Sequence, residues 1–241
     1  MSYATETTLR DLALAYPAAL GVLELHRLDY CCGGQQSLAE ACEGAGLDAE
    51  QVLLEIQAVK SAQPVSVATD TLGALMAHIV ETHHAFTRTS LARIDRLMER
   101  VLLRHGAAHP ELADLNSCVR SLAADLVPHL RKEEEVLFPY VEGLEGHVAQ
   151  GTELPTACFG SVAAPISVMG REHEAVGDLL KQARSITRDY ACPADACSSF
   201  SLLYQELEAL ESDLMRHIHL ENNILFPRAL RLADEVHPGG N

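Results

Sequence analysis

The feature that most constrains this chain is a duplicated motif in which a histidine precedes a glutamate by four positions. Residues 129–139 read HLRKEEEVLFP and residues 217–227 read HIHLENNILFP, so both copies end in Leu-Phe-Pro. On an α-helix, positions i and i+4 lie on one face, about 6 Å apart along the axis. An imidazole and a carboxylate placed in this way can bind the same metal ion or neighbouring ions. A single His-xxx-Glu is common by chance on a solvated helix face, but two copies with the same downstream residues indicate a duplicated metal-binding helix.

The sequence around these motifs predicts four long helices. Apolar periodicity and helix breakers place them at about 71–104, 111–141, 165–190 and 198–233. A short glycine-containing turn joins the first two and a proline-containing turn joins the last two, whereas the crossover at 143–163 contains four glycines and is long. Helices connected in this order predict an all-α fold built on an antiparallel four-helix bundle.

Antiparallel folding of these helices brings six side chains to one level. The point midway between His84 and His129 falls in the turn that joins the first two helices. The point midway between His173 and His217 falls in the turn that joins the last two. The predicted metal ligands are therefore His84, His129, Glu133, His173, His217 and Glu221. Polar groups buried together are costly when they are unpaired, so this set favours two metal ions, each with two imidazoles, bridged by the two carboxylates. Such a mixture of nitrogen and oxygen ligands suits iron or manganese.

Residues 1–62 predict a small domain of short helices, and a linker at 61–69 separates it from the bundle at 70–235. A domain this short has a small core, so we expect it to pack against the bundle or against a second chain in a homodimer. Its distinctive motif is the turn DYCCGG, which contains Cys31 and Cys32. These two cysteines either act as reactive thiols or serve as small residues that fill a tight turn.

Composition limits the partners and the compartment. The formal net charge is −16, and an acidic surface of that size repels nucleic acid and anionic membranes. The sequence has no uninterrupted apolar run of about 18 residues and no basic-then-apolar start. The seven cysteines are an odd number, which favours reduced thiols over a disulfide framework. We therefore expect a soluble cytoplasmic protein that binds neither nucleic acid nor membrane.

Several residues near the predicted site remain outside it. His105 would lie about 31 Å from His84 along a continuous helix, too far to share a ligand set. His83 and His219 are rotated off the ligand face. The remaining acidic neighbours, which include Glu134 and Glu172, are either acceptors for the ligand histidines or simply solvated charges.

Taken together, the two HxxxE motifs and the DYCCGG turn resemble the "repair of iron centres" family of hemerythrin-like proteins. That family is implicated in restoring iron–sulfur clusters after nitric oxide or oxidant damage, and the resemblance extends over nearly the whole chain. It implies two non-haem iron ions with oxo or hydroxo and carboxylate bridges, held by the six ligands named above. It also implies damaged iron–sulfur proteins or scaffold proteins as partners, and nitric oxide and O2 as small ligands. The chain differs from the pattern of oxygen-carrying hemerythrins in two ways. That pattern has Asp five residues after the last histidine, where this chain has Asn222, and it has a third histidine on one iron, for which this chain has no histidine within reach.

This resemblance leads to one functional expectation and one alternative. We expect a repair protein that supplies iron or electrons, with Cys31 and Cys32 as a thiol relay and with nitric oxide chemistry as a complement; whether it is an enzyme stays open. The alternative is a sensor or carrier that binds oxygen or nitric oxide, which would use the same bundle without needing the cysteines.

Overall fold

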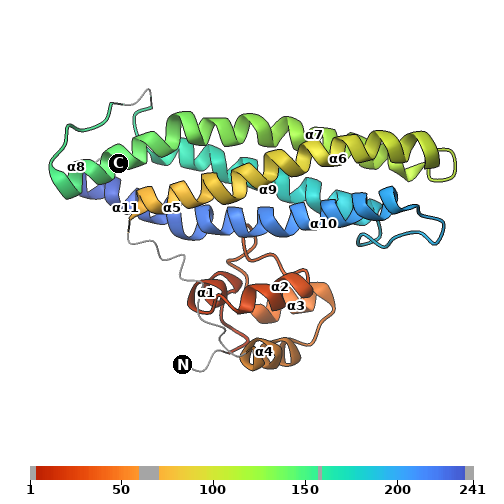
Figure 1. Ribbon diagram of the computed structural model, residues 1–241. Coiled ribbons are helices and arrows are strands. Elements are labelled where there is room, and N and C mark those ends of the chain that lie inside the picture. Colours follow the sequence, from red (N-terminus) through yellow and green to blue (C-terminus); the bar gives the residue numbers. More distant parts are fainter. Residues whose placement is uncertain (1–3, 60–70, 157–158, 237–241) are drawn as a thin grey trace.

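The computed structural model describes residues 4–59, 71–156 and 159–236, and these residues form an all-helical protein (Figure 1). The linker predicted at 61–69 and Cys158 lie outside the described residues. In Figure 1 the long helices form an elongated bundle, and the four short N-terminal helices lie together on one side of it.

The N-terminal region consists of four short helices: α1 (Leu9–Ala15), α2 (Ala19–Leu25), α3 (Leu38–Ala45) and α4 (Ala49–Ala58). Side-chain caps start three of them, α1, α3 and α4. Thr8 Oγ1 accepts a hydrogen bond from the Asp11 amide at 3.1 Å, and Ser37 forms a reciprocal capping box with Glu40. These local signals begin the helices, but each helix is too short to be stable without packing against something larger.

The bundle contains the four predicted long helices, three of which are interrupted. The elements are α5 (Leu72–His78), η1 (Ile79–His84) and α6 (Ala85–His105); α7 (Glu111–Lys132), η2 (Glu133–Leu137) and α8 (Phe138–Gln150); α9 (Ala163–Ile186); and α10 (Ser198–His219), η3 (Leu220–Leu225) and α11 (Phe226–Val236). The three η segments are π-helical turns that lie within otherwise continuous helices. Within the bundle, α6 packs against α10 and α7 packs against α9.

The second long helix runs further than predicted. It continues past Pro139 to Gln150, where Gly151 adopts a left-handed conformation with φ 69°. Proline is tolerated because it falls in the first turn of α8, directly after a π-helical turn, where the proline nitrogen is not required as a donor. The crossover to α9 therefore occupies only 151–162, and glycine at 151 allows the left-handed helix end.

Buried apolar side chains form two clusters along the bundle. One contains residues such as Leu91, Leu122 and Leu214, and the other contains residues such as Ile79 and Leu137. Along each long helix the predicted ligand histidines lie between the stretches that supply these two clusters. The site is therefore a polar layer enclosed on both sides by apolar packing.

The N-terminal helices share an apolar cluster with the bundle. Tyr30 has no exposed surface and its ring lies edge-on to the His219 ring, with a centroid separation of 5.4 Å. The Glu24 carboxylate of α2 accepts two hydrogen bonds of 2.7 Å from the Arg216 guanidinium on α10. The turn that carries Cys31 and Cys32 is therefore packed against the bundle.

Candidate metal centre

Six buried side chains from four helices converge in the polar layer of the bundle. They are the six predicted ligands, His84, His129, Glu133, His173, His217 and Glu221, and none has more than 2% of its surface exposed. They form two groups, and the potential ligand atoms within each group lie within 4.8 Å of one another. Both groups contain the same two carboxylates and differ in their histidines. The structure thus brings together every residue of the predicted set.

Each imidazole pair joins the two halves of the sequence repeat. The Nε2 atoms of His84 and His217 are 3.1 Å apart, and those of His129 and His173 are 3.0 Å apart. Each pair therefore takes one histidine from either copy of the repeat, so that neither half can complete a group alone.

Each carboxylate lies between the two histidine pairs. Glu133 Oε2 is 3.5 Å from His84 Nε2, and its Oε1 is 3.4 Å from His129 Nε2. Glu221 shows the same division, with Oε1 3.0 Å from His217 Nε2 and Oε2 3.2 Å from His173 Nε2. One oxygen of each carboxylate faces one histidine pair and the other oxygen faces the second pair, which is the arrangement that a bridging carboxylate requires.

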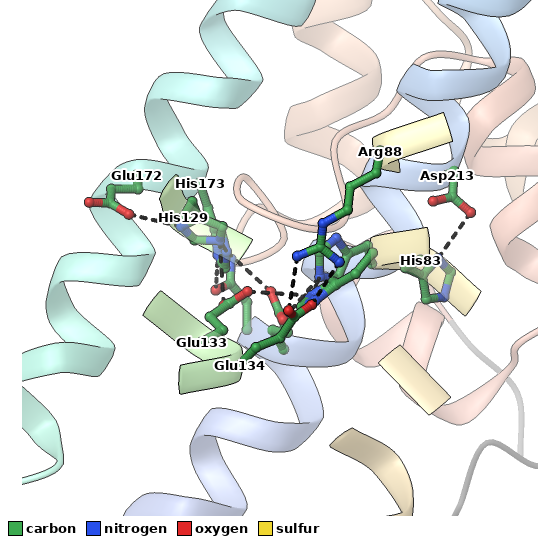
Figure 2. A network of polar contacts seen from close by, with 12 residues as sticks. His83, Arg88, His129, Glu133, Glu134, Glu172, His173 and Asp213 are labelled. Atoms are coloured by element: carbon green, nitrogen blue, oxygen red, sulfur yellow. Dashed lines mark hydrogen bonds and ion pairs between the residues drawn. The ribbon is translucent and has the colours of Figure 1, made fainter. Parts of the chain in front are cut away.

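In three of the four ligand histidines, acceptors around the cluster fix which nitrogen carries a proton, whereas Nδ1 of His217 is buried without a hydrogen-bond partner. Glu134 Oε1 lies 2.7 Å from His84 Nδ1, and Glu172 Oε2 lies 2.8 Å from His129 Nδ1 (Figure 2). Asn222 Oδ1 lies 2.9 Å from His173 Nδ1. With Nδ1 donating outwards, the Nε2 lone pairs point into the cluster, as is usual for histidines that bind metals.

The six side chains do not satisfy one another's hydrogen-bonding groups, and bound cations would satisfy them. In the His129–His173 pair both Nδ1 atoms donate outwards, so two Nε2 lone pairs face each other across 3.0 Å and neither nitrogen has a proton to donate. Both oxygens of Glu133 and Oε2 of Glu221 are buried without a hydrogen-bond partner. Unpaired buried charges are strongly unfavourable unless a cation compensates them. The donor set of imidazole nitrogen and carboxylate oxygen, with thiolates outside it, suits iron, manganese or zinc.

Ionisation in the metal-free protein reflects this crowding. Burial and the neighbouring His217 lower the pKa of His84 to about 4, and burial with His173 lowers the pKa of His129 to about 4. Burial and repulsion from Glu221 raise the pKa of the Glu133 carboxyl well above its usual range. Without a bound cation, the site therefore disfavours protonation of His84 and His129 and disfavours a negative charge on Glu133.

Ligand positions coincide with the π-helical turns. His84 ends η1, Glu133 begins η2 and Glu221 lies in η3. A π-helical turn inserts one extra residue and rotates the face that follows, and such turns are frequent at functional sites. We predicted uninterrupted α-helices, because the sequence carries no separate signal for these turns. His83, which we expected to be rotated off the ligand face, lies outside both ligand groups; it is buried and lies 2.9 Å from Asp213 (Figure 2).

The Leu-Phe-Pro ends of the repeat also have a place in the site. Phe138 stacks on His84 with a centroid distance of 5.9 Å, and Phe226 stacks on His173 at the same distance. Each phenylalanine therefore fixes the plane of one imidazole in the other helix of its own hairpin. The repeated Phe was visible in the sequence, but its role depends on helix pairing.

The cysteine turn is connected to the cluster through one side chain. Asn222 Nδ2 donates to the Cys31 carbonyl at 3.2 Å, while its Oδ1 accepts from His173. Cys31 and Cys32 are both free thiols, with their sulfurs 3.8 Å apart. Cys32 is partly exposed and lines a pocket of about 260 Å³ together with Asn222 and Phe226. Sequence reasoning noted Asn222 only as a departure from oxygen carriers and missed this link.

Comparison with known proteins agrees with these features. Residues 75–229 match the hemerythrin HHE cation binding domain, and residues 5–60 match a domain of unknown function, DUF542. Two relatives are called iron-sulfur cluster repair protein YtfE, one from Yersinia pseudotuberculosis serotype O:1b (strain IP 31758) and one from Yersinia pestis (strain Pestoides F). Each is 34% identical to this chain over 241 residues, covering 96% of this chain and 99% of the relative. Among the described residues, no helix combines the length and apolar character needed to cross a membrane.

Proposed function

The chain belongs to the hemerythrin HHE cation binding family and, over nearly its full length, to the iron-sulfur cluster repair proteins. We propose that it repairs damaged iron–sulfur clusters with two iron ions held in the bundle core. One ion would be held by His84 and His217 and the other by His129 and His173, with both carboxylates between them. When bound, iron supplies exchangeable metal, electrons and open positions for small molecules such as nitric oxide or O2.

The residues of this chain prepare the ligands for that role. Glu134, Glu172 and Asn222 hold the outward protons of three histidines and so keep the inner nitrogens free to bind metal. Arg88 forms two hydrogen bonds of 2.9 Å to Glu134, which keeps that carboxylate charged and in place. Glu134 and Glu172 are partly exposed, so they lie between the buried ligands and the surface of the bundle.

The observation that carries the proposal is the hydrogen-bonded connection from His173 through Asn222 to the Cys31 carbonyl. A sensor or carrier of diatomics needs the bundle alone, whereas this chain places a pair of thiols against the same layer. A hydrogen bond to Cys32 and burial raise the pKa of the Cys31 thiol well above its usual range, so Cys31 keeps its proton at neutral pH. Cys32 lines the open pocket, and we assign it the contact with iron in transit or with the damaged partner.

The test compares cysteine variants of iron-loaded protein in reactivating an iron–sulfur enzyme that has been treated with nitric oxide. We expect Cys31→Ser/Cys32→Ser protein to keep its iron content and visible spectrum but to reactivate the enzyme more slowly, and Cys32→Ser alone to account for most of the loss. The control is Cys192→Ser, which changes an exposed thiol in the turn before α10.

Unchanged repair by the double variant would show that the cysteines only fill the turn. Loss of iron from that variant would make the thiols ligands, against our assignment. A stable and reversible oxygen adduct of the reduced protein would instead favour the carrier alternative.

A further inference from the structure

A second cluster of potential ligands lies at one end of the bundle, away from the six-residue layer. It joins the turn between α6 and α7, which carries His105 and His109, to the turn before α10, which carries Asp195 and Cys197. The ligand atoms of the two histidines and Asp195 lie within 4.8 Å of one another. His105 is 21 residues beyond His84, roughly 31 Å along the helix, so this cluster is separate from the six-residue layer.

Two contacts within the cluster are close to the separations of ligand atoms around a tetrahedral ion. His109 Nε2 is 3.2 Å from both oxygens of Asp195, and His105 Nε2 is 3.2 Å from Cys197 Sγ. For metal–ligand bonds of about 2.0–2.3 Å, neighbouring ligand atoms of a tetrahedral site are about 3.3–3.6 Å apart. The observed contacts of 3.2 Å are slightly shorter than these separations, so an ion would push the contacting atoms slightly apart, and Cys197 is placed beside the cluster by its contact with His105.

The His109 ring is oriented in the way that metal-binding histidines are. Its Nδ1 atom lies 2.9 Å from Glu111 Oε1, which leaves Nε2 directed at the cluster. Phe200, which is fully buried, packs against both imidazoles with centroid distances of 5.3 Å. An ion pair between His109 and Asp195 would explain one contact, but it would not explain why His105 and Cys197 meet beside it.

We infer that His105, His109, Asp195 and Cys197 form a mononuclear site for a divalent cation of the zinc class. Two imidazoles, a carboxylate and a thiolate are ligands that Zn²⁺ accepts in tetrahedral sites, and a site with all four positions filled by protein is structural rather than catalytic. The ion would tie the turn of the first helical hairpin to the turn of the second, at the end of the bundle that the iron layer does not reach. Binding an ion to the folded state alone stabilises that state.

The experiment titrates iron-loaded full-length protein with Co²⁺ and then with Zn²⁺, and both metals and iron are measured in the same dialysed samples. We expect one additional ion per chain, unchanged iron content, thiolate-to-cobalt charge-transfer absorption and displacement of Co²⁺ by Zn²⁺. Asp195→Asn changes an exposed side chain, so folding is preserved, and it should weaken binding of the additional ion by more than about tenfold. Cys197→Ser should abolish the charge-transfer absorption, whereas Cys192→Ser in the same turn should retain it.

Three results would overturn this inference. One is the absence of a third ion at a tenfold molar excess of Co²⁺ or Zn²⁺. Another is uptake of Co²⁺ only in exchange for iron, which would place it in the six-residue layer. The last is affinity within twofold of the parent in both Asp195→Asn and Cys197→Ser protein, which would place the additional ion elsewhere.

Discussion

Replacing Asn222 with alanine should weaken iron binding although Asn222 is not a proposed ligand. The amide accepts the Nδ1 proton of His173 and donates to the Cys31 carbonyl, so the variant removes both contacts. The adjacent Asn223 offers a matched control, because it donates to the Tyr30 carbonyl at 3.1 Å and contacts His219, which is outside the ligand set. Each variant thus removes one hydrogen bond to the backbone of the cysteine turn, but only Asn222→Ala removes support from a ligand.

The two contacts predict effects of different sizes. Loss of the acceptor that orients a metal-binding histidine typically reduces metal affinity 10–100-fold, which is about 1.4–2.7 kcal/mol. Loss of one hydrogen bond to the turn should reduce the stability of either variant by about 0.5–1.5 kcal/mol. We therefore expect both variants to unfold at lower temperature, and only Asn222→Ala to bind iron more weakly.

The assay is anaerobic competition between the protein and a coloured ferrous chelator, together with thermal unfolding of the same samples. Parent-like iron affinity in Asn222→Ala protein would refute the orienting role. Equal loss of affinity in both variants would show that docking of the turn, rather than support of His173, controls iron binding.

Three further predictions concern the bridge, the metal-free state and the docked helices. After identical purification, Glu133→Leu protein should retain less iron than any variant in which one ligand histidine is replaced by leucine, because the Glu133 carboxylate faces both ion positions. Near-full iron occupancy of Glu133→Leu protein would contradict a bridging role. Metal-free protein should lose stability as the pH falls from about 6.5 to about 4, because unfolded His84 and His129 bind protons at their ordinary pKa while the folded pKa is about 4. These two sites contribute up to about 2.7 kcal/mol per pH unit, and the raised pKa of Glu133 offsets part of this because the folded state binds a proton there in the same range. A pH-independent free energy of unfolding would contradict the net loss. Glu24→Ala should reduce the free energy of unfolding by about 2–4 kcal/mol, because the largely buried Glu24 carboxylate accepts four hydrogen bonds. The control is Glu208→Ala, which removes an exposed carboxylate paired with Arg27 across the same interface and should cost less than about 1 kcal/mol.

The ligand layer was predictable because its motif repeats and the positions of the turns set the height of each ligand. Equal height of His84 with His129, and of His173 with His217, follows from the turns alone, whereas the pairing of His84 with His217 and of His129 with His173 appears only in the structure. The predicted all-helical bundle is confirmed, and it too followed from repeated signals, namely the apolar periodicity of the long helices and the residues that break them. The assignment of ions to these ligands stays a prediction, because its test requires bound metal.

Other features depend on relationships that a sequence does not display. The π-helical turns shift the register by one residue, yet no residue type marks them. The contacts of Asn222 and Phe226 arise only after helices pack and the N-terminal helices dock. Cys197 was unassigned, since its neighbour His105 lies 92 positions away along the chain.

The most direct test of the central claim is metal analysis with Mössbauer spectroscopy on protein purified without oxygen. The repeat gives both ion positions the same ligands, namely two imidazoles and one oxygen from each of two carboxylates. We therefore predict two iron ions per chain, with nearly identical Mössbauer parameters and magnetic coupling after oxidation. One iron per chain, or two magnetically isolated irons in clearly different environments, would contradict a shared dinuclear centre.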